Sequence, residues 1–454
     1  MQTRVLRLDH APDLAAVAAT HPDSYPFLLD SAASGPLGHW SLLLRHGGEK
    51  IVLSESGHCT GAGEGGFFDR LDSAFEEARH DTPEAYAHLP FLGGWFLYLA
   101  YEAAGDIEPV LDLPAAGDGL PAALAARCEG AILLRHDAPG GAWLVAEEPG
   151  LLDTMQAELA NLDEEPACKA IVRELVADPA PQFEASVERI HEYILAGDVF
   201  QVNLSRGWKG QFSQPVDPTA LYRRLCEANP APFAGLMRWD DRALLSSSPE
   251  RLVEIREGLV QTRPIAGTHP RGRDAESDRA LANRMLAHPK ERAEHIMLID
   301  LERNDLGRVC HPGSVEVDEL MVLETYAHVH HIVSNVRGRL REDVGPGEVI
   351  RAVFPGGTIT GCPKVRCMQI IAELEGGGRG FYTGSMGYLD HRGHMDLNIL
   401  IRSMLVDGAE FRFRTGAGIV ADSQPAAEVA ETEHKARGLL AALGAGARLQ
   451  AVVA

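Results

Sequence analysis

Two pairs of glutamates, far apart in the chain, have the spacing of neighbours on one helix face. Glu291 and Glu294 stand in "KERAEH", and Glu428 and Glu431 stand in "AEVAETEHK". Like charges so placed repel by about 0.2–0.5 kcal/mol unless a cation lies between them. A hard divalent ion such as Mg²⁺ takes oxygen ligands, and its presence between the carboxylates would make the arrangement favourable. The pairs predict a Mg²⁺ site if their helices meet; two solvated helix faces are the open alternative.

Two glycine-rich turns favour a small anionic ligand. "FPGGTITGCPK", 354–364, places Thr358 among three glycines, a composition suited to a backbone cradle for a carboxylate or phosphate. Cys362 and Pro363 precede Lys364, so the spacing excludes a nucleotide-binding P-loop. "TGAGIVADS", 415–423, leads into a predicted helix, whose free N–H groups attract anions. Ordinary turns remain the alternative for each segment.

Two further segments could contribute polar groups. "RPIAGTHPRG", 263–272, sets the Thr268 hydroxyl among arginines, prolines and glycines, but its centre is the unreactive Ala266. "HVHHIVSN" contains His331, whose type suits proton transfer near neutral pH, although a histidine in an apolar run is commonly a core residue. "GHCTG", 57–61, fits a nucleophile elbow, but about 60 upstream residues cannot complete a glutaminase domain. We therefore expect no ammonia production by this chain.

Composition limits the partners and the compartment. The 454 residues carry a net charge of -23, which argues against nucleic acid or an anionic membrane as partner. The longest apolar stretch, 91–101, is too short to cross a bilayer, and no signal peptide is evident. Seven cysteines at scattered spacings include no C-x-x-C pair, so reduced thiols are expected. These features predict a cytoplasmic protein.

The apolar pattern predicts an α+β protein. Residues 1–150 alternate short apolar runs with turn residues, which indicates strands, with a helix near 69–79. A Pro-rich segment predicts a boundary near 170–182, followed by a helix ending at Gly197 and then a strand. Residues 251–262 suggest two strands joined by a turn, and 278–309 and 425–445 are helical in pattern. Strands and helices do not alternate strictly, which favours α+β.

The motifs of residues 183–440 resemble the chorismate-utilising enzymes in order and spacing. They are "GDVFQVNLSR", "SSSPERLVE", "TRPIAGTHPRG", "KERAEHIMLIDLERNDLGRV", "HVHHIVSNVRG", "FPGGTITGCPKVRCMQII", "YTGSMGYLD", "LNILIRSM" and "GAGIVADSQPAAEVAETEHKA". "YPFLLDSAASG" and "LPFLGGWFLYLAYE" extend the resemblance towards the N-terminus. It implies two large, mainly antiparallel sheets packed as a sandwich with helices outside. It also implies an N-terminal region, 1–170, packed against a chorismate-binding catalytic domain, 183–445.

The resemblance also implies roles for individual residues. Glu250 matches the acid that protonates the departing 4-hydroxyl of chorismate, His331 an active-site histidine, and Thr268 a residue close to the substrate. Mg²⁺ would be held by Glu291, Glu294, Glu428 and Glu431. The substrate would be held by Thr358, Tyr382, Arg402, Gly416, Ala417, Gly418 and Lys435.

The nucleophile is expected to be ammonia. Family members that add water carry a lysine where this chain has Gln201, so a separate glutamine amidotransferase subunit is the expected ammonia source. "QVNLS", "HVHH" and "PGGTITG" favour the branch that aminates C4. Ala266 favours the branch that aminates C2 and expels pyruvate, because the C4 branch has a nucleophilic lysine there. We prefer C4 amination and keep C2 amination as the alternative.

Two further alternatives concern regulation. "LLDS" and "NPAPF", 28–31 and 229–233, resemble the family's tryptophan pocket, which could bind tryptophan or serve only the structure. A non-catalytic, Mg²⁺-dependent anion-binding relative would be expected to lack a motif, and only the lysine is absent. The length excludes a fused glutaminase.

Overall fold

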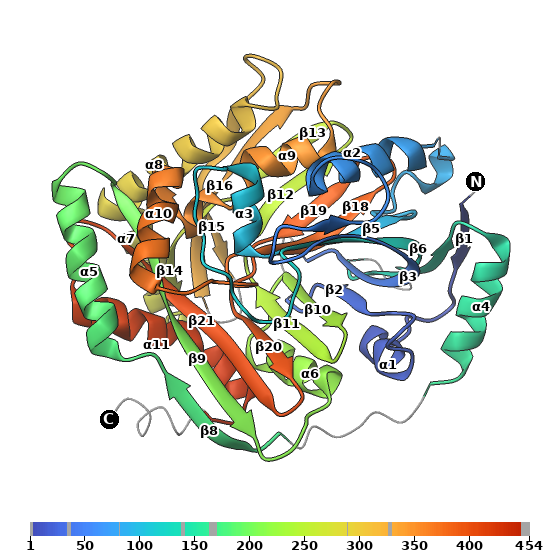
Figure 1. The fold of residues 1–454 in the computed structure, drawn as a ribbon, viewed down its shortest axis with the longest axis horizontal. Coiled ribbons are helices and arrows are strands. Elements are labelled where there is room, and N and C mark those ends of the chain that lie inside the picture. Colours follow the sequence, from blue (N-terminus) through green and yellow to red (C-terminus); the bar gives the residue numbers. More distant parts are fainter. Residues whose placement is uncertain are drawn as a thin grey trace.

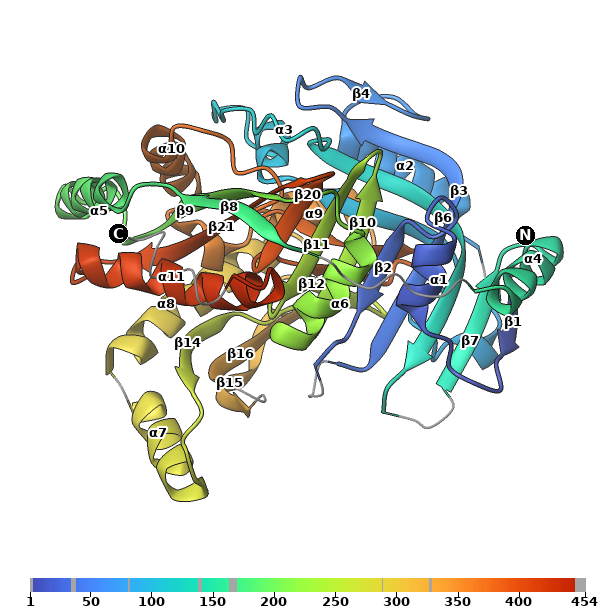
Figure 2. The same ribbon diagram turned by 90° about the horizontal axis from the view of Figure 1, so that it is seen from below.

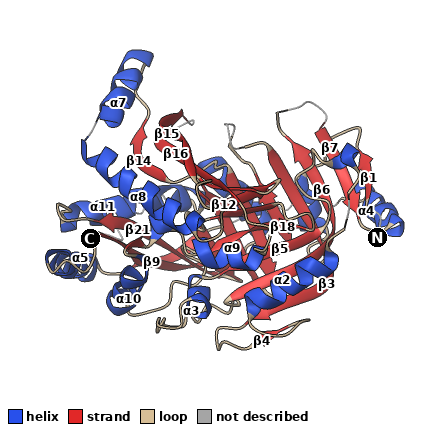
Figure 3. Ribbon diagram, turned by 90° about the horizontal axis from the view of Figure 1, so that it is seen from above, coloured by secondary structure: helices blue, strands red, loops and turns tan. Residues whose placement is uncertain are grey.

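The computed structural model describes residues 3–33, 38–80, 82–137, 141–162, 170–287, 289–325 and 329–445. Within these ranges it leaves out the side chains of residues 266, 268–270, 275, 285–287, 289–291 and 329. Strands occupy the centre of the molecule and helices lie outside them (Figures 1 and 3). No described helix is both long and apolar enough to cross a membrane.

The described strands are hydrogen-bonded into one continuous antiparallel network, which folds into two sheets that share two long strands. The first runs in the order β1 (Arg4–Arg7), β7 (Gly141–Ala146), β6 (Ala123–Arg135), β3 (Trp40–Leu53), β2 (Phe27–Asp30), β10 (Phe233–Trp239), β11 (Arg242–Ser248), β20 (Ser403–Asp407), β21 (Glu410–Ile419) and β9 (Gln201–Phe212). The free side of β9 pairs with β8 (Val172–Ala177) and β17 (Gly361–Cys362).

The second sheet starts from the other ends of the shared strands. Its order is β4 (Cys59–Thr60), β3, β6, β5 (Gly94–Leu99), β18 (Ser385–Asp390), β19 (Met395–Asn398), β12 (Arg251–Arg256), β13 (Leu259–Thr262), β16 (Val329–Arg339) and β15 (Glu316–Thr325), with β14 (Ile265–Pro270) also on β16. The pairing of β3 with β6 shifts register beside His46, so both strands can bend from one sheet into the other.

Helices cover the outer faces of both sheets. Apolar residues of α1 (Leu14–Thr20), α4 (Pro149–Ala160), α6 (Pro218–Ala228) and α11 (Pro425–Ala442) join a core against the first sheet. Those of α2 (Phe67–Ala78), α3 (Ala104–Ile107), α5 (Ala180–Leu195), α8 (Pro289–Gly307), α9 (Pro346–Val353) and α10 (Lys364–Glu375) join a core that includes the second sheet. Short 3₁₀ turns are η1 (Glu84–Tyr86), η2 (Tyr101–Ala103) and η3 (Gly357–Ile359). Helix α7 (Ala275–Ala287) projects from the body beyond β14 (Figure 2).

A third apolar core lies between the sheets. It joins Phe96 and Tyr98 of β5 to Leu244 of β11 and Leu405 of β20. Phe96 stacks on Phe27 of β2 with ring centroids 4.0 Å apart. The α+β class and the two packed sheets with outer helices are therefore confirmed.

Several predicted elements occur where the sequence places them. Helix α2 corresponds to the helix near 69–79, and α5 ends before Gly197, whose φ of 81° suits a residue without Cβ. Strands β12 and β13 are joined by a turn at Glu257 and Gly258, both with positive φ. The helical pattern over 278–309 is divided between α7 and α8, and α8 begins at Pro289, where the missing N–H of proline is tolerated.

The two regions predicted from the sequence, 1–170 and 183–445, are joined by strand pairing. Strand β5 pairs with β18, and β2 pairs with β10, so strands of 1–170 are hydrogen-bonded to strands of 183–445 in both sheets.

Phe96→Ala should lower the free energy of unfolding by about 3–5 kcal/mol, because it removes a buried ring and leaves a cavity between the sheets. Urea unfolding followed by fluorescence measures the change. Phe200→Ala is the control, since Phe200 is 68% exposed and its loss should change stability by less than about 0.5 kcal/mol. Equal effects of the two substitutions would contradict the placement of the inter-sheet core.

Candidate functional site

Two glycines of β21 form the floor of the candidate site. A Cβ at Gly416 would lie 2.7 Å from the Tyr382 hydroxyl, and one at Gly418 would lie 2.4 Å from Nε2 of Gln201. We call the surface formed by Gln201, Asn203, Tyr382, Gly416 and Gly418 the glycine groove. A side chain on either glycine would displace these polar groups.

Ala417 lies between the two glycines but faces the other way. Its methyl group is fully buried in the core that includes the second sheet. Successive side chains of a strand point to opposite faces, so only the backbone of Ala417 can face the groove. The three residues predicted to bind substrate together therefore divide between groove and core.

Polar atoms without hydrogen-bond partners gather around the groove. Within the described part of the chain, these include Oε1 of Gln201, Oδ1 of Asn203, Oε1 of Glu250 and Oγ1 of Thr358, all buried. Leaving a buried polar group unpaired costs about 1–3 kcal/mol, so such groups call for a functional explanation. Their convergence is typical of a site that binds a polar ligand.

Glu250 follows β11 and is only 7% exposed. Burial raises the pKa of its carboxyl to about 7, against the opposing effects of the Thr358 hydroxyl, Lys435 and Arg402. A carboxyl that retains its proton near neutral pH can serve as a general acid. Because Thr358, Lys435 and Arg402 all act on this carboxyl, the four residues lie near one another, as the sequence predicts.

Arg402 and Lys435 supply positive charge beside the groove. Arg402 has a φ of 53°, unusual for a residue with a side chain and costly enough to suggest a positional requirement. Burial lowers the pKa of its guanidinium, whereas Tyr382, Glu431 and Glu250 raise it. Nζ of Lys435 donates to the Gly416 carbonyl at 2.9 Å and pairs with Glu431 at 2.7 Å. Two cations so placed suit a ligand with carboxylates.

His331 lies on β16 as a buried, neutral group. Burial lowers the pKa of its imidazole to about 4, with a further contribution from Arg402. Thr268 of β14 is opposite His331 in the strand pairing, but its side chain lies outside the described residues. His330 instead makes contacts at 2.8 Å with Asp278 of α7 and 2.9 Å with Thr325 of β15. His331 is therefore the histidine that could act in the candidate site, whereas His330 links β16 to α7 and β15.

The predicted metal-binding glutamates lie on the two helices expected for them. Nε2 of Gln201 donates to Oε1 of Glu294 at 3.2 Å, so α8 contacts one end of the groove. Glu431 is connected to the groove by its ion pair with Lys435, and Glu428 is in the first turn of α11. The side chain of Glu291 lies outside the described residues. The described side chains include no group of three His, Cys, Asp or Glu close enough to hold a metal. The carboxylate oxygens are nevertheless of the kind that Mg²⁺ prefers.

A buried ion network borders the groove on the same face of β9 and β21, and the sequence analysis missed it. Arg379 pairs with Glu375 at 2.6 Å, and Arg414 pairs with the same carboxyl at 2.9 Å. Glu375 also accepts from the backbone N–H and hydroxyl of Ser205 on β9. Helix α10 ends at Glu375 and three glycines separate it from Arg379, so helical spacing in the sequence does not predict this pair.

The segments resembling a tryptophan pocket are adjacent. Strand β2 pairs with β10, and the Ser31 hydroxyl donates to the Pro232 carbonyl at 3.0 Å. Both carboxyl oxygens of Asp30 accept hydrogen bonds, from Ser41 at 2.5 Å and Tyr222 at 3.0 Å. Because internal partners occupy this carboxyl, the contacts favour a structural role for the two segments.

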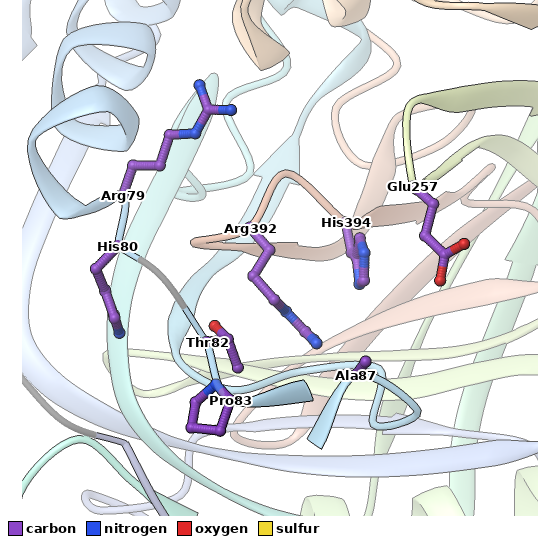
Figure 4. A pocket seen from close by; sticks show the side chains of 8 residues that line it. All are labelled: Arg79, His80, Thr82, Pro83, Ala87, Glu257, Arg392 and His394. Carbon is purple, nitrogen blue, oxygen red and sulfur yellow. The ribbon is translucent and has the colours of Figure 1, made fainter. Parts of the chain in front are cut away.

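A cavity of about 550 Å³ lies elsewhere, between the turn after β12, the turn after β18 and the segment after α2 (Figure 4). None of the candidate site residues lines it. Arg392 on its wall is paired with Asp390 at 2.8 Å, and Arg79 lies 3.6 Å from Glu76. Nη1 of Arg392 and Nδ1 of His394 on its wall are also buried without hydrogen-bond partners. The groove gathers four such oxygens from described residues beside Arg402 and Lys435, which makes it the better candidate site.

Comparison with known proteins identifies the family of this chain. A model of the chorismate binding enzyme family matches residues 38–441. The chain belongs to this family. It is therefore a chorismate-utilising enzyme.

Proteins named for anthranilate synthase and for aminodeoxychorismate synthase are both similar to this chorismate-utilising enzyme. An anthranilate synthase component I-like protein of Synechocystis sp. is 45% identical over 78% of this chain and 74% of that protein. Aminodeoxychorismate synthase component 1 of Bacillus subtilis is 49% identical over 58% of this chain and 55% of that protein. The crystal structure of anthranilate synthase component I from Streptococcus pneumoniae has a TM-score of 0.77 and 31% identity, covering 89% of this chain and 92% of that one.

Glu250→Gln should lower kcat by about 10²–10⁴-fold, because the amide cannot donate the carboxyl proton. In the free wild-type enzyme, Glu250 is mostly protonated below its raised pKa of about 7, so kcat/KM should decline as the pH rises through that value. Chorismate consumption measured across pH tests both points. The residual activity of the variant should lack this decline, and Glu257→Gln, an exposed residue outside the site, should retain it. A wild-type profile that is flat through neutral pH would contradict the acid role.

Proposed function

We propose that this chorismate-utilising enzyme is an aminodeoxychorismate synthase component I acting in the cytoplasm. It would aminate chorismate with ammonia from a glutamine amidotransferase subunit and yield 4-amino-4-deoxychorismate for 4-aminobenzoate and folate synthesis. The observation that carries the proposal is the placement of Gln201 and Asn203 of "QVNLS" in the glycine groove, with buried carbonyl oxygens unpaired. Asn203, from the motif that favours C4 amination, therefore lies in the candidate site.

The residues of the groove suit replacement of the 4-hydroxyl. Arg402 and Lys435 hold carboxylates of chorismate, and Glu250 donates its proton to the departing hydroxyl, which leaves as water. Ammonia forms the new C–N bond and releases a proton. Ala266 has no nucleophile, so the enzyme uses no covalent lysine adduct and delivers ammonia to C4 directly.

Mg²⁺ is part of the proposal. Glu294 and Glu431, with Glu291 and Glu428, would hold the ion beside the groove. When bound, it would polarise the ring carboxylate of the substrate.

Anthranilate synthase component I is the second candidate. It is favoured by Ala266 in "PIAGT" and by relatives of that name. The same acid and cations would then serve ammonia addition at C2, followed by elimination of pyruvate.

Incubation of the purified enzyme with chorismate, Mg²⁺ and concentrated ammonium should give a product with the mass of aminodeoxychorismate and no pyruvate. Mass spectrometry identifies the product, and a lactate dehydrogenase assay measures pyruvate. Addition of aminodeoxychorismate lyase should then give 4-aminobenzoate. Stoichiometric pyruvate and anthranilate without the lyase would refute C4 amination and support the second candidate.

Glu294→Ala and Glu431→Ala should each reduce turnover by more than about 100-fold, since even supporting residues of metal sites contribute about 10–100-fold. Both should also weaken Mg²⁺ binding in calorimetric titrations. Asp300→Ala is the control on α8, because Asp300 is exposed and paired with Arg303. Unaltered Mg²⁺ affinity in both glutamate variants would exclude the metal assignment.

A further inference from the structure

Arg379 is a buried side chain whose donors all have acceptors within the protein. Only 1% of the side chain is exposed. Nε and Nη2 donate to the two carboxyl oxygens of Glu375 at 3.1 and 2.6 Å. Nη2 also donates to the Asn203 carbonyl at 2.7 Å, and Nη1 donates to the Ile359 carbonyl and the Thr383 hydroxyl, each at 3.2 Å. These bonds use all five N–H donors of a guanidinium, so Arg379 can affect a ligand only through the groups that it holds.

The acceptors of Arg379 belong to three segments that border the candidate site. The first is β9, whose Asn203 is part of the glycine groove. The second is η3, which also contains Thr358, a predicted substrate ligand. The third is the segment 380–384, which carries Tyr382 and which we call the Tyr382 loop. The guanidinium carbon lies 5.6 Å from the centroid of the Tyr382 ring. One side chain therefore connects three walls of the groove.

The backbone of the Tyr382 loop needs such support. Thr383 has a φ of 61°, which is an outlier for a β-branched residue. Conformations of this kind are costly and persist only where their surroundings hold them. The Thr383 hydroxyl accepts from Arg379 and donates to the Tyr382 carbonyl at 2.5 Å, and its N–H donates to the Leu400 carbonyl at 2.8 Å. The contact with Arg379 thus helps to fix the loop that presents Tyr382 to the groove.

The region 1–170 holds Arg379 in turn. The carboxyl of Glu102, in η2, accepts from the backbone N–H of Arg379 at 2.6 Å and from that of Gly380 at 3.0 Å. The guanidinium carbon lies 4.9 Å from the centroid of the Tyr101 ring. The position of this arginine therefore depends on both regions of the chain.

We propose that Arg379 is a positioning residue for chorismate binding, because its guanidinium fixes β9, η3 and the Tyr382 loop relative to one another. Lysine cannot replace it, since an ammonium is a compact group with three donors and cannot span these separate acceptors. The inference rests on the groove as the chorismate site and holds whichever carbon is aminated.

Arg379→Lys should raise KM for chorismate by about tenfold or more, since hydrogen bonds of a charged group each correspond to about that factor in an equilibrium constant. The decline of kcat/KM with pH that reports Glu250 should persist, because the acid itself is unchanged. Hydrogen–deuterium exchange of the variant should be faster at 380–384, where the support of the loop is lost.

Arg127→Lys is the matched control. Nη2 of Arg127 donates to both carboxyl oxygens of the buried Glu147, at 2.7 and 2.6 Å, and its guanidinium carbon lies 5.0 Å from the centroid of the Trp95 ring. This variant loses the same kind of fork contact with glutamate and aromatic ring, but outside the glycine groove. Its KM and its exchange at 380–384 should match those of the wild type even where its Tm falls as much as that of Arg379→Lys.

A second pair of variants decides the question if Arg379→Lys does not fold. Thr383→Val keeps the β-branched shape but removes one acceptor of Arg379, so its KM should rise by about tenfold. Thr383→Ser retains the hydroxyl and should have the KM of the wild type.

The outcomes separate the inference from the assignment of the site. A wild-type KM in folded Arg379→Lys or in Thr383→Val would overturn the inference, as would equal increases in Arg379→Lys and Arg127→Lys, which would follow from a general loss of stability. Arg402→Gln removes a cation of the site itself. If its KM were unchanged as well, the groove would not be the chorismate site, and the inference would fail together with that assignment.

Discussion

The site depends on two positions in β21 at which no side chain can fit. With hydrogen atoms in place of Cβ, Gly416 and Gly418 let Tyr382 and Gln201 approach the strand to within contact distance. Lys435 can then reach the carbonyl of Gly416 from α11. Helix α11, the paired strand β9 and the loop that carries Tyr382 can thus all lie close to β21 because Gly416 and Gly418 have no side chains.

The groove is lined by positive charge, whereas the chain as a whole is negatively charged. The net charge of -23 repels a dianion, but exposed charges are screened beyond about 8–10 Å at ordinary ionic strength. Inside the site, Arg402 and Lys435 supply positive charge, whereas burial raises the pKa of Glu250 to about 7 and leaves its carboxyl partly protonated near neutrality. A small number of buried groups therefore decides ligand affinity. The acidic surface sets solubility and discourages other polyanions.

The sequence predicted elements well where the signal was local. The turn at Glu257 and Gly258 and the helix stop near Gly197 follow from backbone conformations that few residues adopt. The family motifs located Glu250, Arg402 and Lys435, which the structure brings together. Strand alternation could have excluded the side chain of Ala417, since its neighbours face the groove. The neutral state of Glu250 could not be read from the sequence, because its burial depends on strands and turns that are distant in the chain.

The pairing of β5 with β18 has a consequence for how the protein is made. Strand β5 is synthesised early, whereas β18 lies near the C-terminal end, and contacts of such wide separation form slowly. All six residues of β5 are buried in the finished structure. Until β18 emerges, β5 offers an apolar edge that can pair with another chain. The unfinished chain is therefore open to self-association at Gly94–Leu99 until β18 has been synthesised.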